Sequence, residues 1–583
     1  MKQNCFEKLY TKAGERLAEH VEQIPWEIYP RPHMERDSFL CLNGWWEFGM
    51  GDARKGLPVC DRQIRVPFVA GSLLSGVEKL VPRRALLRYC RRFTLPGGFS
   101  DGRVLLHIGA ADQRAEVRLN GTLLGEHVGG YEPFCLDVTE TISSENLLEI
   151  LVWDTQGDTV LPYGKQRGKR GGMWYTDVAG IWQTVWLECV PQQYIKALEV
   201  QSDGTGATVR VEAGNTAIFG TVVAHFEQGD REFPLENGRA RIEVDVPHLW
   251  SPEDPYLYRF TVHAGEDTVR SYFALRTLEI KPVEGVSRLC LNGKPYFFHG
   301  LLDQGYFSDG LFTPAEPEEY ERDILAAKHL GFNMLRKHIK VEPERFYYDC
   351  DRLGMVVFQD MVNNGRYSFL GDTALPTVGF KRRNDKRRHR DGATRVAFLQ
   401  GMEQTVRRLS FHPCICYWTI FNEGWGQFDH AAAYQQLKGM DATRFIDSVS
   451  GWFLPPKRME LQSDVVSPHI YFRPVRLARE EKPLVLSEFG GYSHKVEGHC
   501  FNLKQNYGYR SFAQREELAV ALERLYLEEV LPYIREGLCA AVYTQLTDVE
   551  DETNGLLTYD RRVCKVDEMH MQRIAKALYR EMK

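Results

Sequence analysis

The sequence predicts a multidomain protein in which two β-sandwiches precede a (β/α)8 TIM barrel. Three observations lead to this prediction. The chain has 583 residues, which is too long for a single hydrophobic core. About the first 280 residues consist of short Val-, Leu- and Ile-rich runs separated by turn residues. From about residue 285, strand-like runs alternate with helical stretches, as in a sheet of parallel strands.

The first domain is expected over residues 1–190 as a jelly-roll-like β-sandwich. Residues 103–139 alternate short apolar runs with Asn-Gly and Gly-Gly pairs, which favour tight hairpin turns. The runs 147–154 and 181–190 continue the pattern. A second group of short strands is expected within residues 191–282, at 207–214, 240–247, 256–264 and 269–280. Its length is typical of an immunoglobulin-like sandwich.

The third domain is expected over residues 283–583 as the barrel. Eight runs have the composition of buried strands, at 294–302, 331–338, 354–361, 414–423, 445–452, 464–472, 483–491 and 539–548. Helical stretches such as 317–330, 393–409 and 515–534 separate most of them. Eight alternations over about 300 residues indicate a (β/α)8 barrel. The fifth and sixth runs are joined by a short link, so we expect a reduced helix there.

Composition and charge exclude several classes of function. The net charge of −6 gives no general attraction to nucleic acid or to an anionic membrane surface. No stretch approaches 18 uncharged apolar residues, and residues 1–23 lack the apolar core of a signal peptide. The 13 cysteines show no paired or zinc-ligand spacing. We therefore expect reduced thiols in a cytoplasmic protein, with no membrane span, no nucleic-acid partner, no metal and no cofactor.

Polar residues stand where the barrel strands are expected to end. In a TIM barrel these carboxyl-terminal strand ends form the active-site face. A carboxylate at one strand end could instead cap the following helix. Such a role does not explain polar residues at so many ends. The candidate site residues are Asp303, Arg336, His338, Asn422, Glu423, Trp452, His469, Tyr471, Glu488, Gln545 and Asp548.

Two glutamates stand at the ends of the fourth and seventh runs. In a (β/α)8 barrel these two strands lie on opposite sides of the opening. Glu423 and Glu488 can therefore face each other over a bound ligand. Opposed carboxylates are the apparatus of glycoside hydrolysis, in which one protonates the leaving oxygen and the other meets the developing oxocarbenium ion. This arrangement also explains why a buried strand can end on a carboxylate, because Glu423 would point into a polar pocket.

The segments around both glutamates resemble glycoside hydrolase family 2, which holds β-galactosidases, β-glucuronidases and β-mannosidases. Residues 421–426 (FNEGWG) resemble the acid/base strand of that family, and residues 485–491 (VLSEFGG) its nucleophile strand. Further likeness lies in 29–48, 66–77, 117–139, 172–188, 248–258 and 289–305. The resemblance implies a retaining mechanism with Glu423 as acid/base and Glu488 as nucleophile. It also implies carboxyl groups about 5–5.5 Å apart.

The resemblance also assigns roles to neighbouring residues. Asn422 would bind the sugar 2-hydroxyl, and Tyr471 would orient the nucleophile. His469, Arg336 and His338 would complete the site, although the family often places the histidine three residues after the arginine rather than two. His338 could equally be structural. Trp425 and Trp452 could stack on the sugar or pack in the core. The extra sandwich domains imply a homo-oligomer.

The identity of the sugar stays open at this stage. The β-glucuronidases carry an Asn-x-Lys pair that grips the uronate carboxylate, where this chain has Glu552, Thr553 and Asn554. Other cations could replace it, namely Arg336, Lys337, Lys340 and the basic stretch 381–390, which could also be a solvated loop or an oligomer contact.

We expect a retaining exo-β-glycosidase that releases terminal β-linked galactose-like or hexuronic acid residues from a carbohydrate or glycoconjugate. One alternative is specificity for another β-sugar, such as a mannoside, arabinoside or galactofuranoside. A second alternative is a carbohydrate-binding protein with an inactive barrel. Epimeric sugars differ only in the placement of one hydroxyl, so pocket loops decide between them.

Overall fold

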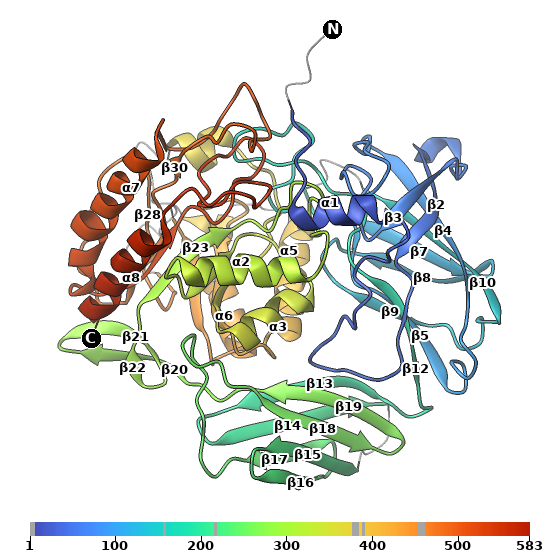
Figure 1. Cartoon of the computed structure of the whole chain (residues 1–583). Coiled ribbons are helices and arrows are strands. Elements are labelled where there is room, and N and C mark those ends of the chain that lie inside the picture. Colours follow the sequence, from blue (N-terminus) through green and yellow to red (C-terminus); the bar gives the residue numbers. More distant parts are fainter. Residues whose placement is uncertain are drawn as a thin grey trace.

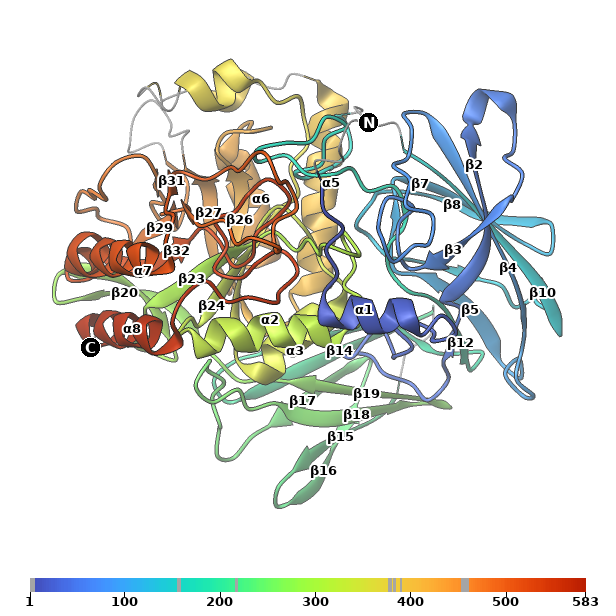
Figure 2. The same ribbon diagram turned by 45° about the horizontal axis from the view of Figure 1, so that its top comes forward.

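The computed structural model describes residues 6–154, 159–214, 219–375, 380, 384–387, 391–451 and 461–582. Figure 1 shows two sandwiches and a barrel, with the barrel beside the first sandwich and the second sandwich against both. The same arrangement is visible after a 45° turn in Figure 2. The order of these parts along the chain is the one that the sequence predicts. The domain limits at 190 and 282 stay a prediction.

The first sandwich consists of antiparallel sheets around a core of aliphatic and aromatic side chains. Its six-stranded sheet has the order β3-β2-β4-β10-β7-β8, and its four-stranded sheet has the order β1-β12-β5-β9. Burial alternates along strands such as β7, as expected for sheets with one face on the core. The strands are β1 (Leu40–Cys41), β2 (Gly44–Asp52), β3 (Arg62–Val66), β4 (Ala85–Thr94), β5 (Arg103–Ile108), β6 (Ala111–Asp112), β7 (Arg114–Leu119), β8 (Thr122–Val128), β9 (Phe134–Asp137), β10 (Glu145–Trp153), β11 (Gly180–Ile181) and β12 (Val185–Val190).

The second sandwich packs a three-stranded sheet, β13-β14-β17, on a four-stranded sheet, β16-β15-β18-β19. Inward-facing residues of both sheets form its core, among them Val209, Val222, Phe260 and Val262. Its strands are β13 (Ile195–Ser202), β14 (Gly206–Ala213), β15 (Gly220–Phe226), β16 (Gly229–Leu235), β17 (Arg239–Glu243), β18 (Tyr258–Ala264) and β19 (Asp267–Phe273). A small sheet of β20 (Leu278–Val283), β21 (Val286–Leu291) and β22 (Lys294–Pro295) then leads into the barrel.

The barrel is an eight-stranded parallel sheet, and each of the eight expected runs contains one of its strands or overlaps it. The order is β27-β26-β25-β24-β23-β32-β29-β28. The two ends of this order meet, because the amide of Gly451 after β27 donates to the carbonyl of Ser467 before β28 (2.9 Å). The barrel prediction is therefore confirmed. The strands are β23 (Phe298–Asp303), β24 (Met334–Lys337), β25 (Val356–Asp360), β26 (Ile415–Asn422), β27 (Phe445–Ser450), β28 (His469–Ile470), β29 (Leu484–Phe489) and β32 (Leu538–Tyr543).

Helices cover most of the barrel but not the part around β28. The described residues 461–468 before β28, where a reduced helix is expected, hold no helix. The residues between β28 and β29 hold none either, and the sequence did not predict that gap. The intervening α-helices are α2 (Glu318–His329), α3 (Glu344–Leu353), α5 (Gly392–Leu409), α6 (His430–Met440), α7 (Arg515–Arg524) and α8 (Glu568–Met582). A shorter helix, α1 (Lys12–Glu19), precedes the first sandwich.

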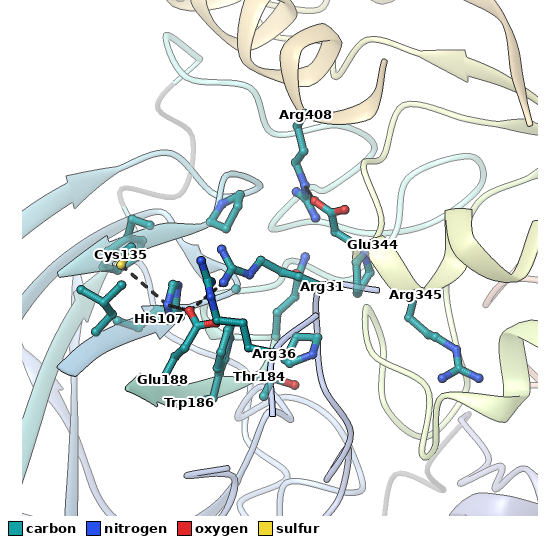
Figure 3. Close-up of a pocket in the computed structure, with 18 of the residues that line it drawn as sticks. Arg31, Arg36, His107, Cys135, Thr184, Trp186, Glu188, Glu344, Arg345 and Arg408 are labelled. Atoms are coloured by element: carbon teal, nitrogen blue, oxygen red, sulfur yellow. Dashed lines mark hydrogen bonds and ion pairs between the residues drawn. The ribbon is translucent and has the colours of Figure 1, made fainter. Parts of the chain in front are cut away.

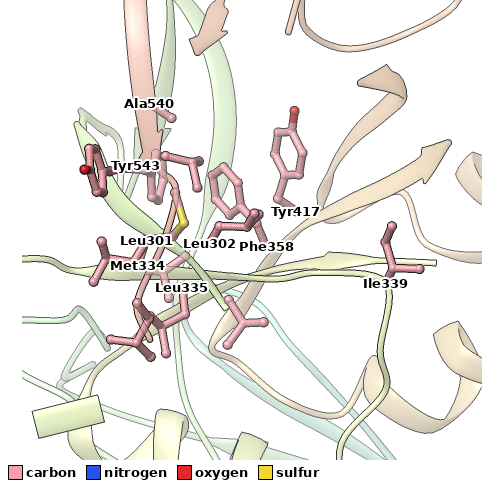
Figure 4. Packing of buried hydrophobic residues seen from close by; sticks show 14 of the residues in the cluster. Leu301, Leu302, Met334, Leu335, Ile339, Phe358, Tyr417, Ala540 and Tyr543 are labelled. Carbon is pink, nitrogen blue, oxygen red and sulfur yellow. The ribbon is translucent and has the colours of Figure 1, made fainter. Parts of the chain in front are cut away.

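Side chains fill the interior of the barrel. Met334, Phe358, Tyr417 and Ala540 belong to one buried cluster, drawn in Figure 4. The rings of Phe358 and Tyr417 stack with their centroids 4.1 Å apart. A ligand therefore cannot enter the barrel interior, and an active site of the barrel lies at the strand ends.

No helix in the described part of the chain combines the length and the apolarity needed to cross a bilayer.

Candidate active site

Two glutamates and a histidine meet at the carboxyl ends of the barrel strands. Glu423 directly follows β26, and Glu488 lies on β29. One side-chain oxygen of each glutamate and Nδ1 of His469 all lie within 4.8 Å of one another. His469 Nδ1 is 3.0 Å from Oε1 of Glu423 and 3.5 Å from Oε2 of Glu488. The structure thus places both sequence-predicted carboxylates at one site.

The backbone turns at Glu423, directly after the last residue of β26. Its φ angle is +50°, in the left-handed region, and the following glycine has a φ of +70°. Its amide still donates to the carbonyl of Ser450 (2.8 Å). Non-glycine residues in this region cost about 1–2 kcal/mol and often mark functional positions. As a result, the side chain of Glu423 is 23% exposed at the end of a strand that is otherwise buried.

Glu488 is buried, and hydrogen-bond donors contact both of its oxygens. Arg336 donates from Nη1 to Oε1 (3.0 Å), and the hydroxyl of Tyr471 donates to Oε2. Burial raises the pKa of Glu488, but the positive charges of His469 and Arg336 outweigh it and hold the pKa below its usual range. Burial, together with the charge of Glu488, raises the pKa of Tyr471. Glu488 is therefore ionised at neutral pH, and Tyr471 stays protonated as its donor.

Arg336 connects the site residues through hydrogen bonds to four protein groups. Besides Glu488, its guanidinium binds Oδ1 of Asp360 (2.9 Å) and Oδ1 of Asn422 (2.9 Å). Burial lowers the pKa of Arg336, but the charges of Asp360 and Glu488 more than reverse this and raise it. The arginine stays charged and is only 1% exposed. It therefore orients Asn422 and Glu488.

The two predicted histidines occupy different positions. His338 lies with Nδ1 2.7 Å from Oδ2 of Asp360, and burial together with the charge of Lys165 lowers its pKa. No hydrogen bond recorded for the described residues joins His338 to either glutamate, so it supports Asp360. His469 bridges Oγ of Ser450 (3.0 Å) and Glu423, and so contacts the glutamate pair directly.

A small cavity opens beside Glu423. It is lined by Lys165, Met173, Trp174, Ile339, Tyr367, Asp372, Asn422, Glu423 and Trp425. Trp425 is 5% exposed and donates from Nε1 to the carbonyl of Gly365 (3.2 Å), with its ring edge-to-face against Trp174 (5.1 Å). Trp425 therefore both packs in the core and forms a wall of the cavity.

Three other predicted site residues are bonded elsewhere. Asp303 pairs with Lys337 (2.5 Å), and Asp548 pairs with Lys565 (2.6 Å). Gln545 bonds Glu552 (2.7 Å) and Gln304 (2.7 Å). These strand-end residues are buried and bind other protein groups instead of meeting the glutamate pair. Trp452 lies outside the described residues.

The cations proposed from the sequence to hold a sugar acid are also engaged. Lys337 binds Asp303 and Glu342, and Lys340 binds Glu342 and the carbonyls of Gly305 and Phe312. Both lysines are buried. Of the basic stretch 381–390 only residues 384–387 are described.

Lys165 is a site residue that the sequence reasoning missed. It lies in the long connection between β10 and β11 of the first sandwich, yet it lines the same cavity as Glu423. Among the described residues, no hydrogen bond or ion pair is recorded for its ammonium group. The signal was present, because a connection of this length without a strand is uncommon and often functional.

The glutamate pair also has donor types that could hold a metal. Glu423, His469 and Glu488 form the one such cluster of three found in the described part of the chain. His469 is already bonded to Ser450, and the guanidinium of Arg336 already supplies positive charge to Glu488. A metal ion would have to compete with that charge. The expectation of no metal stays a prediction.

Comparison with known families gave two matches in order along the chain. The family described as "Glycosyl hydrolases family 2" matches residues 194–276. "Glycosyl hydrolases family 2, TIM barrel domain" matches residues 283–507. The two matches cover the second sandwich and the barrel as far as the residues after Glu488.

Curated relatives are distant and mostly longer. A β-galactosidase of Thermoanaerobacter pseudethanolicus is 24% identical over 57% of this chain and 44% of that protein. The β-glucuronidase of Mus musculus is 26% identical over 60% of this chain and 56% of that protein. The human β-glucuronidase is 25% identical over 69% of this chain and 68% of that protein. The chain thus spans about half the length of the first two.

Solved structures share the whole fold. A β-D-glucuronidase of Dictyoglomus thermophilum superimposes with a TM-score of 0.71 at 18% identity, covering 94% of this chain and 98% of that one. A β-galacturonidase of Eisenbergiella tayi bound to galacturonate gives 0.68 at 17% identity, covering 94% and 99%. The likeness at this identity concerns the fold.

Proposed function

The chain belongs to glycoside hydrolase family 2, and from this membership and its paired glutamates we propose that it is a retaining exo-β-glycosidase. Its substrates would be terminal β-linked galactose-like or hexuronic acid residues. One observation supports the mechanism above all others: oxygens of Glu423 and Glu488 approach within 4.8 Å. Retaining enzymes hold their carboxyl groups about 5–5.5 Å apart, whereas inverting enzymes need about 6.5–9.5 Å to admit water.

In the first step, Glu488 attacks the anomeric carbon. Its lowered pKa keeps the attacking oxygen ionised, and Arg336 and Tyr471 hold the carboxylate in place. As the glycosidic bond breaks, Glu423 gives its proton to the departing oxygen. The result is a glycosyl ester on Glu488 and a free aglycone alcohol.

In the second step, Glu423 takes a proton from water, and the water oxygen displaces Glu488 from the anomeric carbon. The partial exposure of Glu423 allows water to reach it. Two displacements at one carbon return the β configuration. Glu488 carries a negative charge before the first step and none as an ester, so the charge beside Glu423 changes between the steps.

Asn422 is suited to bind the sugar next to the reacting carbon. Its Oδ1 accepts from Arg336, which fixes the amide so that its N–H groups are left for a ligand. The residue lines the cavity together with Glu423. A hydrogen bond from this amide to the 2-hydroxyl would strengthen as charge develops on the sugar.

The position of Lys165 favours hexuronic acids over galactose-like sugars among the proposed substrates. Arg336, Lys337 and Lys340 all bind protein carboxylates or carbonyls. Lys165 has no recorded polar partner among the described residues and lines the cavity beside Glu423. An ammonium group is suited to a carboxylate at C6 of a hexuronic acid. The sugars in the names of the relatives given above, galactose and glucuronic acid, carry different groups at C6.

A panel of nitrophenyl β-glycosides tests the proposal. The native chain should hydrolyse at least one of the β-galactoside, β-glucuronide and β-galacturonide, and NMR should detect the β-anomer as the first product. Glu488→Gln should lower kcat at least about 10⁴-fold on the same substrate. An α-anomer as first product would contradict retention. Equal, near-zero turnover by both proteins would instead favour a carbohydrate-binding protein with an inactive barrel.

We also infer a reducing, cytoplasmic location and a homo-oligomer. All twelve cysteines in the described part of the chain are free thiols, which suits a reducing compartment. The oligomer rests on the family likeness alone, and light scattering after gel filtration would measure it.

A further inference from the structure

A large cavity lies away from the glutamate pair, where the two sandwiches and the barrel meet. Its volume is about 560 Å³, within the range of small-molecule sites. The first sandwich supplies residues of β5, β9 and β12, and the barrel supplies residues near the start of α3. Figure 3 shows these two sides facing each other. The cavity shares no lining residue with the one beside Glu423.

The lining is rich in positive charge although the whole chain is acidic. Six lysine and arginine side chains line the cavity against three carboxylates. The carboxylates are Asp137, Glu188 and Glu344, each already paired with an arginine of the lining. The cations are Arg31, Arg36, Arg103, Lys196, Arg345 and Arg408. Arg36 and Arg345 also bind Asp267 and Asp349, which lie outside the lining. The charge of Lys196, for which the described structure shows no ion pair, is therefore the one that favours an anion.

Several donors in the lining have no partner in the described structure. Arg31 binds Glu188 through Nη2 (2.7 Å), and no hydrogen bond is recorded from its Nη1. Lys196 is exposed, with no recorded ion pair or side-chain hydrogen bond. Gln183 is 6% exposed, and its Nε2 is buried without a partner. Donors left unpaired in this way favour a ligand that brings acceptors.

The rest of the wall is apolar. Leu105, Ile108, Phe134 and Ile195 line it, and the indole of Trp186 is covered by the stacked ring of His107 (4.1 Å) and by Arg31 (5.0 Å). Figure 3 shows the guanidinium groups of Arg31 and Arg36 beside His107 and Glu188. A suitable ligand therefore has an apolar body at one end and an anionic group that reaches Arg31 and Lys196.

We propose that this cavity is a binding site for a small organic anion with an apolar ring system, held by Arg31, Lys196 and Gln183. The site is independent of glycoside hydrolysis. Because it joins three parts of the fold, a bound anion would also stabilise their packing.

The test compares two probes that differ in one group. The aromatic sulfonate 1-anilinonaphthalene-8-sulfonate should bind the native protein saturably, with increased fluorescence. N-phenyl-1-naphthylamine has the same rings without the sulfonate and should bind at least tenfold more weakly. Equal affinity for the neutral probe would mean adsorption to apolar surface and would overturn the proposal, as would the lack of saturable sulfonate binding.

Two substitutions locate the site. Arg31→Met and Lys196→Met should each raise the Kd for the sulfonate at least about fivefold, while nitrophenyl glycoside hydrolysis stays unchanged. Glu188 still accepts a hydrogen bond from Arg36 (2.8 Å) when the Arg31 side chain is replaced. Lys196 is exposed, so both variants should fold. The exposed Arg83→Met and Lys294→Met serve as matched controls and should not change the Kd. Unchanged affinity in both test variants would place the probe elsewhere and refute the assignment.

Discussion

The two glutamates differ in their surroundings, and this difference assigns their roles in the proposed mechanism. Glu488 is buried, and donors from Arg336 and Tyr471 hold both of its oxygens. Glu423 is part-exposed and contacts His469 alone among the hydrogen-bond partners recorded for its side chain in the described structure. A nucleophile needs a fixed, ionised oxygen, whereas an acid/base needs access to water.

Replacing Tyr471 with phenylalanine should weaken the nucleophile. The change removes a hydroxyl donor from the carboxylate of Glu488 and leaves the stacked ring of Tyr509 in place (3.7 Å). A hydrogen bond to a charged group is worth about 1.5–3 kcal/mol, so kcat/KM should fall about 10- to 100-fold. The pKa of Glu488 should rise, which moves the acid limb of the pH–kcat/KM profile to higher pH.

Tyr434→Phe is a matched control, because its hydroxyl also donates to a carboxylate, that of Asp464 (2.6 Å), far from the site. Its pH profile should match that of the native enzyme. If Tyr471→Phe lowered kcat/KM without moving the acid limb, the hydroxyl would not act through the ionisation of Glu488.

Replacing Lys165 with methionine tests which sugar is bound. The loss of the ammonium group should lower kcat/KM for a nitrophenyl hexuronide about 10- to 100-fold, since a charge-assisted hydrogen bond is lost. Hydrolysis of the matching galactoside should change less than threefold. Lys169→Met, an exposed lysine of the same connection, is the control. Equal losses on both sugars would show that Lys165 balances the protein carboxylates instead.

At the scale of elements, the closure of the barrel between β27 and β28 positions His469. Gly451 follows β27 with a φ of +93°, and a Cβ there would lie 2.8 Å from Nδ1 of His469. This nitrogen is the atom that contacts Glu423 (3.0 Å). The glycine therefore lets the imidazole lie against the strand end.

Gly451→Ala should push the imidazole toward the glutamates and lower kcat at least about tenfold. The left-handed backbone also makes an alanine cost about 1–2 kcal/mol in stability. Gly293→Ala separates the two effects, because its φ is +76° and nothing lies within 4 Å of the added carbon. This control should lose stability and keep its kcat. A similar kcat for both variants would contradict the positioning role of Gly451.

At the scale of the whole molecule, buried charges join the three parts of the fold. His412 of the barrel lies with Nδ1 2.7 Å from Oδ2 of Asp351 and 3.2 Å from the hydroxyl of Tyr272 in the second sandwich. Glu344 binds both His412 (3.4 Å) and His33, which precedes the first sandwich (2.7 Å). Burial lowers the pKa of His412, but the charges of Asp351 and Glu344 outweigh it and raise the pKa to about 9.

This raised pKa predicts a loss of stability in alkali. A histidine whose folded pKa exceeds the unfolded value of about 6.5 contributes fully below that value. The contribution is lost as the pH rises through about 9 and is of the order of 3 kcal/mol. The urea midpoint should therefore fall between pH 6.5 and 9. His412→Gln should flatten this part of the curve, and the exposed His263→Gln should not. A flat native curve would refute the charged state.

Local pattern was enough to predict the barrel strands and the glutamate pair. Eight apolar runs separated by helical stretches predict the barrel. Parallel strands that are buried on both faces are nearly continuous runs of apolar residues, so they can be recognised in the sequence. Glu423 and Glu488 follow from strand order, since carboxyl ends of parallel strands share one face. Local pattern could not show that Asp303 and Asp548 are neutralised by Lys337 and Lys565, because those pairings cross between elements.

The sequence by itself determined the order of domains, the family and the acidic pair of the site. Only the tertiary structure decided which cations pair with protein carboxylates. Arg336, Lys337 and Lys165 are alike as charged residues in a sequence, yet burial forces the first two into pairs with protein carboxylates. Lys165 reaches the mouth from another domain. The cavity of Arg31 and Lys196 likewise exists only where separate folded parts meet, so no local pattern could predict it.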